Sequence, residues 1–148
     1  MAKSDSGLES CTWDGGRRVG PLTVGEPLFE SLRNSLSLLC VSSEVDGNDT
    51  RDQYRSTLWD VVAWNGVVSE VWANTTLIYN KRDLFQCTHD EFIEIFGEPT
   101  ETDDIANGYV ESLTWAKGVL SPYVGLDVGF GNGLCGSVTV FDPDVVPE

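Results

Sequence analysis

The sequence is short of positive charge. Nine lysines and arginines stand against 24 aspartates and glutamates, so the formal net charge is −15 over 148 residues. Nucleic acids and anionic lipid surfaces carry the same sign of charge and would be repelled. The composition therefore predicts no direct contact with nucleic acid or membrane, and it favours a basic protein partner. A salt-rich cytosol, or solubility alone, would also explain the charge.

Long apolar runs and targeting signals are missing too. No run approaches the roughly 20 apolar residues that span a bilayer, and the first residues lack the apolar segment of a signal peptide. We therefore expect a cytoplasmic protein. Its cysteines would then be reduced thiols, and because no C-x-x-C pair occurs, a zinc site is not expected. Export by an unrecognised route would instead allow two disulfides. The cysteines are Cys11, Cys40, Cys87 and Cys135.

A set of residues typical of catalysis is absent as well. The single histidine, His89, falls in the first turn of an expected helix and has no nucleophile or metal ligand near it in sequence. The chain has no Walker loop, G-x-G-x-x-G or G-x-S-x-G motif. The glycine-rich residues 129–133 are interpreted as a hairpin tip. The sequence therefore predicts a protein that is not an enzyme and that holds no cofactor or metal.

The clearest local signal is a short helix over residues 88–96. Thr88 and Glu91 form a T-x-x-E capping box, and Gly97 followed by Pro99 ends the helix. Apolar residues repeat on one side at helical spacing. Acidic residues four positions apart occupy the other side: Asp90, Glu94 and Glu98.

The two halves of the chain correspond. A second T-x-x-E pair, at Thr23, predicts a helix over residues 24–36, and β-rich runs surround Asn-Gly pairs at Asn65 and Asn132, a strong hairpin signal. The capping boxes lie 65 residues apart and the hairpins 67. We therefore predict an α+β fold with a tandem repeat of a short helix plus antiparallel strands. The repeats would form a curved antiparallel sheet with the helices on one face.

This organisation predicts three segments in one compact domain. Residues 1–20 are polar and rich in Gly and Ser, and we expect a flexible N-terminal arm. Residues 21–80 would form the first helix-sheet unit, and residues 81–148 the second.

The pattern resembles the tandem module of β-lactamase inhibitory protein and the single module of BamE/SmpA-type outer-membrane lipoproteins. In those families a helix ending in G-x-P precedes an antiparallel sheet with a Gly-containing hairpin. The matching residues are FGEP at 96–99, YVESLTW at 109–115 and VGLDVGFGNGLCGSVTVF at 124–141. The chain departs from both families because it has no export signal, no lipidation cysteine near its start and no clear cysteine pairing within each half. The resemblance implies a concave sheet face that is presented to protein partners.

A first candidate binding surface follows from the mid-strand acids Asp60 and Asp127. Charged residues in mid-strand normally face solvent, and strand side chains alternate, so Asp60 marks one exposed face. We predict a partner-binding face that comprises Asp60, Val62, Trp64, Val68, Glu70 and Trp72. Exposed apolar patches are usually functional, and Trp is a common interface anchor. Alternatively, the arm or the tail covers this face, or the Trp residues belong to the core.

A second candidate surface is acidic. The segment from Asp83 to Glu111 contains nine acidic residues and no lysine or arginine. We predict a docking surface for a basic partner, formed by Asp90, Glu94, Glu98, Asp103 and Asp104. Its charge would steer association, and it could also imitate the phosphates of a nucleic acid. A solvated helix face is the alternative.

Together these features predict a non-catalytic acidic inhibitor of the immunity or antagonist type. It would neutralise a basic protein partner such as a toxin or a nucleic-acid enzyme. The alternative is a housekeeping or structural domain of a halophile, in which the acidity is an adaptation to salt.

Overall fold

The computed structural model describes residues 11–104, 110–131 and 133–147. Its main element is an eight-stranded antiparallel sheet with the strand order β3-β4-β5-β6-β12-β11-β10-β9. The strands are β3 (Leu39–Asp46), β4 (Asp49–Arg55), β5 (Trp59–Trp64), β6 (Val67–Ala73), β9 (Glu101–Asp104), β10 (Val110–Trp115), β11 (Gly125–Gly131) and β12 (Leu134–Phe141). Neighbours along the chain are neighbours in the sheet, except that β6 and β12 pair at its centre.

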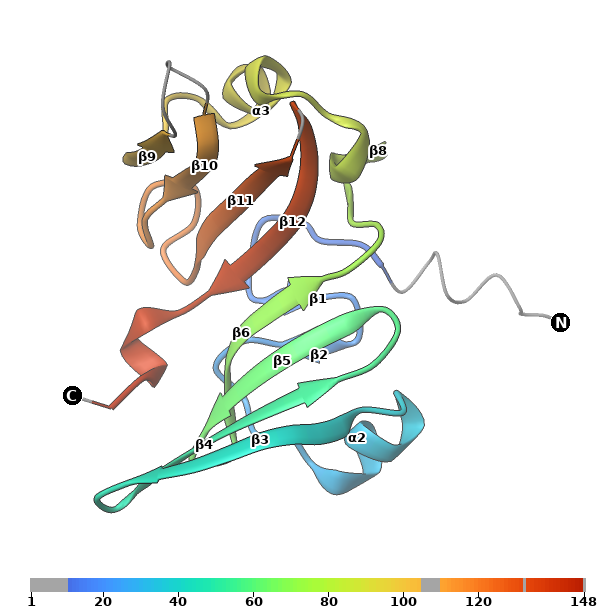
Figure 1. The fold of residues 1–148 in the computed structure, drawn as a ribbon, viewed down its shortest axis with the longest axis vertical. Helices are drawn as coiled ribbons and strands as arrows, with labels where there is room; N and C mark the ends of the chain where they lie inside the picture. Colours follow the sequence, from blue (N-terminus) through green and yellow to red (C-terminus); the bar gives the residue numbers. More distant parts are fainter. Residues whose placement is uncertain (1–10, 105–109, 132, 148) are drawn as a thin grey trace, which may run out of the picture.

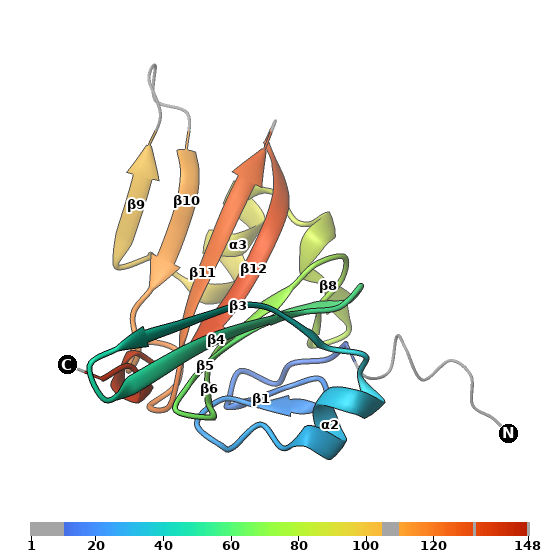
Figure 2. The ribbon, with the colours of Figure 1, turned by 60° about the horizontal axis from the view of Figure 1, so that its bottom comes forward.

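Short elements surround this sheet. Two ribbons are formed by β1 (Arg18–Val19) with β2 (Leu22–Thr23) and by β7 (Ile78–Tyr79) with β8 (Arg82–Asp83). The helices are α2 (Glu30–Ser35), α3 (His89–Phe96) and the 3-10 turns η1 (Leu84–Gln86) and η3 (Pro143–Val145). The strands β3 to β6 form the lower part of the molecule and β9 to β12 the upper part (Figure 1). Figure 2 shows that the two groups of strands run at a large angle to each other.

One face of the sheet carries the hydrophobic core, and we call it the core face. Trp59, Val61 and Trp115 are fully buried there. Helix α3 packs on this face, because its Phe92 meets Phe130 with ring centroids 5.7 Å apart. In Figure 2 the helix lies behind strands β11 and β12. The opposite face, whose side chains alternate with those of the core face, is called the open face below.

The predicted α+β repeat with helices on one face is wrong. Strand makes up 49% of the structure and helix only 15%, so the fold is mainly β. The helix expected at 24–36 is reduced to the six residues of α2. Thr23 pairs with Arg18 in a ribbon instead of capping a helix, and Gly25 has φ +91°. The T-x-x-E pattern at Thr23 was therefore misleading, because the backbone leaves the helical region two residues later.

The helix predicted over residues 88–96 is confirmed as α3. Thr88 Oγ1 accepts a hydrogen bond from the Glu91 N–H at 3.3 Å, and Glu91 Oε1 accepts one from the Thr88 N–H at 2.9 Å. The second of these bonds lowers the pKa of the Glu91 carboxyl, because the hydrogen bond from the Thr88 backbone stabilises its charged form. Gly97 ends the helix at φ +86°. The Asn65-Gly66 hairpin is also confirmed, with both residues at positive φ between β5 and β6.

The prediction of a flexible arm over residues 1–20 is wrong for residues 11–20, while residues 1–10 lie outside the described residues. Cys11, Trp13 and Val19 are buried in the core. The Trp13 ring lies 5.5 Å from that of Tyr79, measured between centroids. Three buried apolar side chains within nine residues outweigh the polar composition of their neighbours.

Candidate functional site

The register of the sheet defines a continuous row of side chains across the open face. Each member is the direct cross-strand partner of the next. From β4 to β9 the row consists of Arg55, Asp60, Trp72, Thr139, Asp127, Thr114 and Glu101. Neighbouring strands lie about 4.8 Å apart, so the row places Trp72 and Asp127 on either side of the small Thr139.

At the start of the row, Asp60 is committed to structure. It is only 8% exposed, and its Oδ2 accepts a hydrogen bond from Arg55 Nε at 3.0 Å. Its Oδ1 accepts another from Asn74 Nδ2 at 3.0 Å. Both oxygens thus have protein partners, and Asp60 has little capacity left for an external ligand.

Val68 does not belong to the predicted binding face. A β-bulge lies between the partner pairs Val62↔Glu70 and Ala63↔Val68, so Ser69 is the extra residue. The bulge breaks the alternation and turns Val68 into the core, where it is 1% exposed. Simple alternation of side chains had placed Val68 beside Glu70, and this part of the prediction is wrong.

Of the remaining predicted residues on this surface, Trp72 is the most accessible. It is 41% exposed, and its Nε1 donates to Glu70 Oε1 at 3.3 Å. Trp64 and Glu70 are half-buried. Val62 is 2% exposed, although it lies outside the hydrophobic core cluster, so it offers almost no area to a partner.

A shallow pocket opens beside Trp72 where β6 meets β12, and we call it the seam pocket. Its volume is about 310 Å³. It is lined by Glu70, Trp72, Thr114, Asp127, Thr139, Phe141, Asp142, Pro143 and Val146. The buried Thr139 stands between Trp72 and Asp127 in the row, and its small side chain leaves room for the pocket.

Two walls of the seam pocket are braced by the fold. The Phe141 ring covers Gly125, where any Cβ would collide with it. The C-terminal segment is held by Lys117, whose Nζ donates to Asp142 Oδ1 at 2.9 Å and to Asp144 Oδ2 at 2.6 Å. These hydrogen bonds to the carboxylates of Asp144 and Asp142 raise the pKa of Lys117, because they stabilise its charged form. The sequence left open that the C-terminal tail covers the predicted binding face. In the structure, the tail residues Pro143 and Val146 line the seam pocket.

The other two acids of the seam pocket have no cation beside them in the described structure. Asp127 Oδ1 accepts a hydrogen bond from Thr114 Oγ1 at 3.0 Å, and among the described residues the Glu70 side chain accepts only from Trp72. Strands β6, β9, β10, β11 and β12 contain no lysine or arginine. Asp127 also lines a neighbouring hollow of about 550 Å³ together with Asp103 and Glu111.

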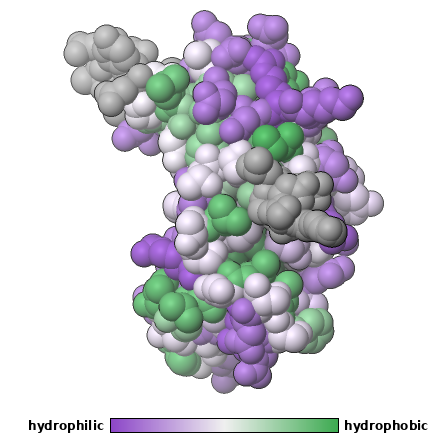
Figure 3. All heavy atoms as spheres, turned by 90° about the vertical axis from the view of Figure 1, so that its right-hand side faces the viewer, coloured by the Kyte–Doolittle hydropathy of each residue, from purple (hydrophilic) through white to green (hydrophobic). Residues whose placement is uncertain are grey.

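The two predicted surfaces do not form one site. Asp90 and Glu94 are exposed on α3, which packs on the core face, whereas Trp72 lies on the open face. Glu98 follows the helix and is exposed too. Seen from the right-hand side of Figure 1, hydrophilic side chains gather over the upper part of the molecule, where α3 and β8 lie (Figure 3). The helical acids thus form a separate surface.

Asp103 and Asp104, which the sequence assigned to the acidic docking surface, lie in strand β9. Asp103 pairs with Ser112 on β10 and lines the hollow beside Asp127. It therefore extends the acidic part of the open face. Asp104 ends β9 opposite Val110 and is exposed.

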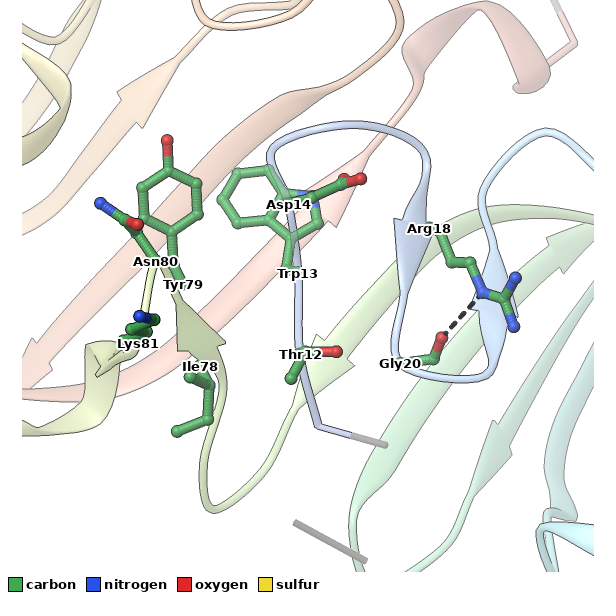
Figure 4. A pocket seen from close by; sticks show the side chains of 9 residues that line it. All are labelled: Thr12, Trp13, Asp14, Arg18, Gly20, Ile78, Tyr79, Asn80 and Lys81. Atoms are coloured by element: carbon green, nitrogen blue, oxygen red, sulfur yellow. Dashed lines mark hydrogen bonds between the residues drawn. The ribbon is translucent and has the colours of Figure 1, made fainter. Parts of the chain in front are cut away.

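A larger pocket, of about 530 Å³, lies elsewhere, beside Trp13 and Tyr79. Two of its lining residues are cationic, Arg18 and Lys81. Figure 4 shows them at opposite ends of the pocket, with Arg18 Nε donating to the Gly20 carbonyl at 3.3 Å. They do not converge on a common position, so the pocket lacks the geometry of an anion site.

The edge strand β3 exposes three large apolar side chains among polar ones. Leu39 is 71% exposed and Val45 74% exposed, and Val41 between them is also exposed. At the other edge, β9 carries acids, which discourage the addition of another strand. The two edges thus differ in chemistry.

The cysteines differ in accessibility. Cys40 is exposed on β3, and Cys87 and Cys135 are buried; none of these three forms a disulfide. Burial raises the pKa of Cys87, and it raises that of Cys135 to about 12.

The described residues contain no group of three or more His, Cys, Asp or Glu side chains that could hold a metal ion. Within the same residues, no helix is long and apolar enough to cross a membrane.

No family model, curated protein or solved structure matches this chain. The resemblance to β-lactamase inhibitory protein and to the BamE/SmpA-type module therefore stays a prediction. The binding function proposed next rests on the geometry of the open face.

Proposed function

We propose that this is a non-catalytic binding protein that captures a basic protein through its open face, as an immunity protein or antagonist would. The observation that carries the proposal is the seam pocket with its surroundings. An exposed Trp72 stands there beside Glu70 and Asp127, neither of which has a cation partner in the described structure.

Two physical arguments support this function. A half-exposed Trp provides large apolar area at a small cost in conformational entropy, which is why Trp is enriched at binding hot spots. The acids around it supply charge complementarity to a cationic surface, which speeds association and selects partners. With a net charge of −15, the whole molecule adds long-range attraction for basic proteins and repulsion of acidic ones.

Comparative capture tests the proposal. The tagged protein, a Trp72→Ala/Asp127→Asn variant and an Asp90→Asn/Glu94→Asn variant are incubated with lysate of the source organism. Bound proteins are identified by mass spectrometry and then purified for affinity measurements. We expect one basic protein to bind the wild type and the helix variant. The open-face variant should lose about 2 kcal/mol or more of binding free energy.

The helix variant is the control, because it removes two charges, one more than the open-face variant, without touching the open face. Equal losses in both variants would show that only net charge matters and would contradict the proposed site. Affinity for the purified partner should also fall as salt rises from about 50 to 300 mM, because exposed charges are screened.

The acidic composition itself favours one alternative, a housekeeping or structural domain adapted to high salt. That function predicts no selective capture, and it predicts a free energy of unfolding that rises steadily into molar salt. An empty capture together with such a rise would replace our proposal.

A further inference from the structure

The seam pocket combines three features. It has an exposed indole at Trp72, a carboxylate at Asp127 without a cation partner in the described structure, and a small, buried floor residue, Thr139. The indole N–H is already used, because it donates to Glu70 at 3.3 Å. What the pocket offers a ligand is therefore an aromatic surface and negative charge.

We propose that the seam pocket receives a single arginine side chain of the partner protein. This inference rests on the proposed function and specifies which group of the partner is recognised. The guanidinium would lie against Trp72, and its N–H groups would donate to the Asp127 carboxylate. The methylene groups would contact the apolar walls formed by Phe141 and Val146.

Arginine fits these features better than lysine. A guanidinium is planar, is weakly hydrated and stacks on aromatic rings, while its N–H groups match a carboxylate. One oxygen of Asp127 is held by Thr114 Oγ1 at 3.0 Å, which restrains the carboxylate. A compact ammonium would reach the carboxylate but would make little contact with the indole face.

Asp142 does not compete for the same ligand. Its Oδ1 accepts from Lys117 at 2.9 Å and from the Asp144 N–H at 2.9 Å. Its backbone N–H donates to the carbonyl of the bulge residue Ser69 at 2.9 Å. Asp142 therefore holds the wall in place, and the charge available to the guanidinium comes from Asp127 and Glu70.

The test uses small probes and the full chain. N-acetyl-arginine methylamide, the corresponding lysine compound and the uncharged citrulline compound are titrated into ¹⁵N-labelled protein, and the Trp indole N–H signals are followed by NMR. The Trp72 signal is identified by its disappearance in Trp72→Phe. We expect a saturable shift of this signal with the arginine probe. Affinity for citrulline should be about three- to tenfold lower, because the uncharged compound loses both a surface cation–π contact and the charge attraction of Asp127.

Asp127→Asn should weaken the arginine response at least about fivefold, and Asp90→Asn, on the opposite side of the sheet, should leave it unchanged. Thermal melting of each variant shows that it is folded. Three results would overturn the proposal: no saturable shift at Trp72, equal affinity for citrulline, or an undiminished response in Asp127→Asn. Equal affinity for the lysine probe would overturn the choice of arginine.

The result of the probe titration can be distinguished from the result of the capture experiment. A partner that binds through the open face while the arginine probe does not bind would reject the arginine pocket and leave the proposed function standing. A specific arginine response without any captured protein would leave the pocket standing and count against the antagonist function.

Discussion

Asp60 and Asp127 hold corresponding places in the two central hairpins but have different surroundings. Asp60 pairs across its hairpin with Trp72, and Asp127 pairs with Thr139. On the preceding strand, Asp60 faces Arg55 and Asp127 faces Thr114. One neighbour supplies a cation and the other only a hydroxyl group. The same residue type in the same register is therefore structural in one half and available for binding in the other.

The difference teaches that the cross-strand partner decides what an acid on a sheet can do. A carboxylate with two hydrogen-bonded partners stabilises the fold, and little of its charge is accessible. A carboxylate with one neutral partner keeps most of its charge for a ligand. Four of the five predictions below compare matched residues in the two halves, on the two faces or on different surfaces of the molecule, and the other concerns the pH dependence of stability.

The largest contrast is expected between the exposed Cys40 of the first half and the buried Cys135 of the second. With its pKa raised to about 12, Cys135 has a thiolate fraction of roughly one in ten thousand at pH 8. We expect a thiol reagent to modify Cys40 at least about 100 times faster than Cys135, as followed by mass spectrometry of peptides. Equal rates would show that the second half opens readily.

The same pKa shift gives a pH dependence. The unfolded chain releases the Cys135 proton near its ordinary pKa of 9.0, whereas the folded chain retains it to about 12. The free energy of unfolding should therefore fall as pH rises between these values. The fall should be smaller in Cys135→Ala, as measured by urea denaturation.

The next contrast compares two Trp residues of one hairpin that face opposite sides of the sheet. Trp59 is 1% exposed in the core, and its replacement by Ala should cost about 3–5 kcal/mol of unfolding free energy. Trp72→Ala should cost less than about 1 kcal/mol, because the ring is partly in water already. Urea denaturation measures both, and similar losses would mean that Trp72 is part of the core.

The comparison of the two acids is sharpened by Asp60→Ala and Asp127→Ala. The first removes the acceptor of both Arg55 and Asn74, and it should cost about 1–3 kcal/mol of unfolding free energy. The second removes one bond from Thr114 and should change stability by less than about 0.5 kcal/mol. If the larger loss occurred in Asp127→Ala, our assignment of structural and available carboxylates would be reversed.

The smallest effect is expected from helix α3. Asp90→Lys with Glu94→Lys reverses two exposed charges on the far side of the sheet, where salt screens their influence on the open face. Affinity for the arginine probe at Trp72 should change less than about twofold at 150 mM salt. A larger change in affinity would show that the acids of helix α3 contribute to binding at the open face.

Several features of the fold could be predicted because their causes are local. Helix α3 depends on hydrogen bonds within its first turn, and the Asn65-Gly66 turn depends on two residues that tolerate positive φ. The prediction of a helix at 24–36 was wrong for a local reason too, because Gly25 and Pro27 disrupt the helix start that Thr23 suggests. The bulge at Ser69, which moved Val68 into the core, had no recognisable signal in the sequence.

The sequence by itself determined the sign and size of the charge, the helix at 88–96 and the alternation that puts Asp60 and Asp127 on the face away from the core. Only the tertiary structure decided which of these acids has a cation beside it. It also brought Trp72 and Asp127 to the two sides of Thr139 by pairing β6 with β12. Such pairings join residues that are distant in the chain, so they depend on how the whole hydrophobic core closes, and short-range patterns carry no record of them.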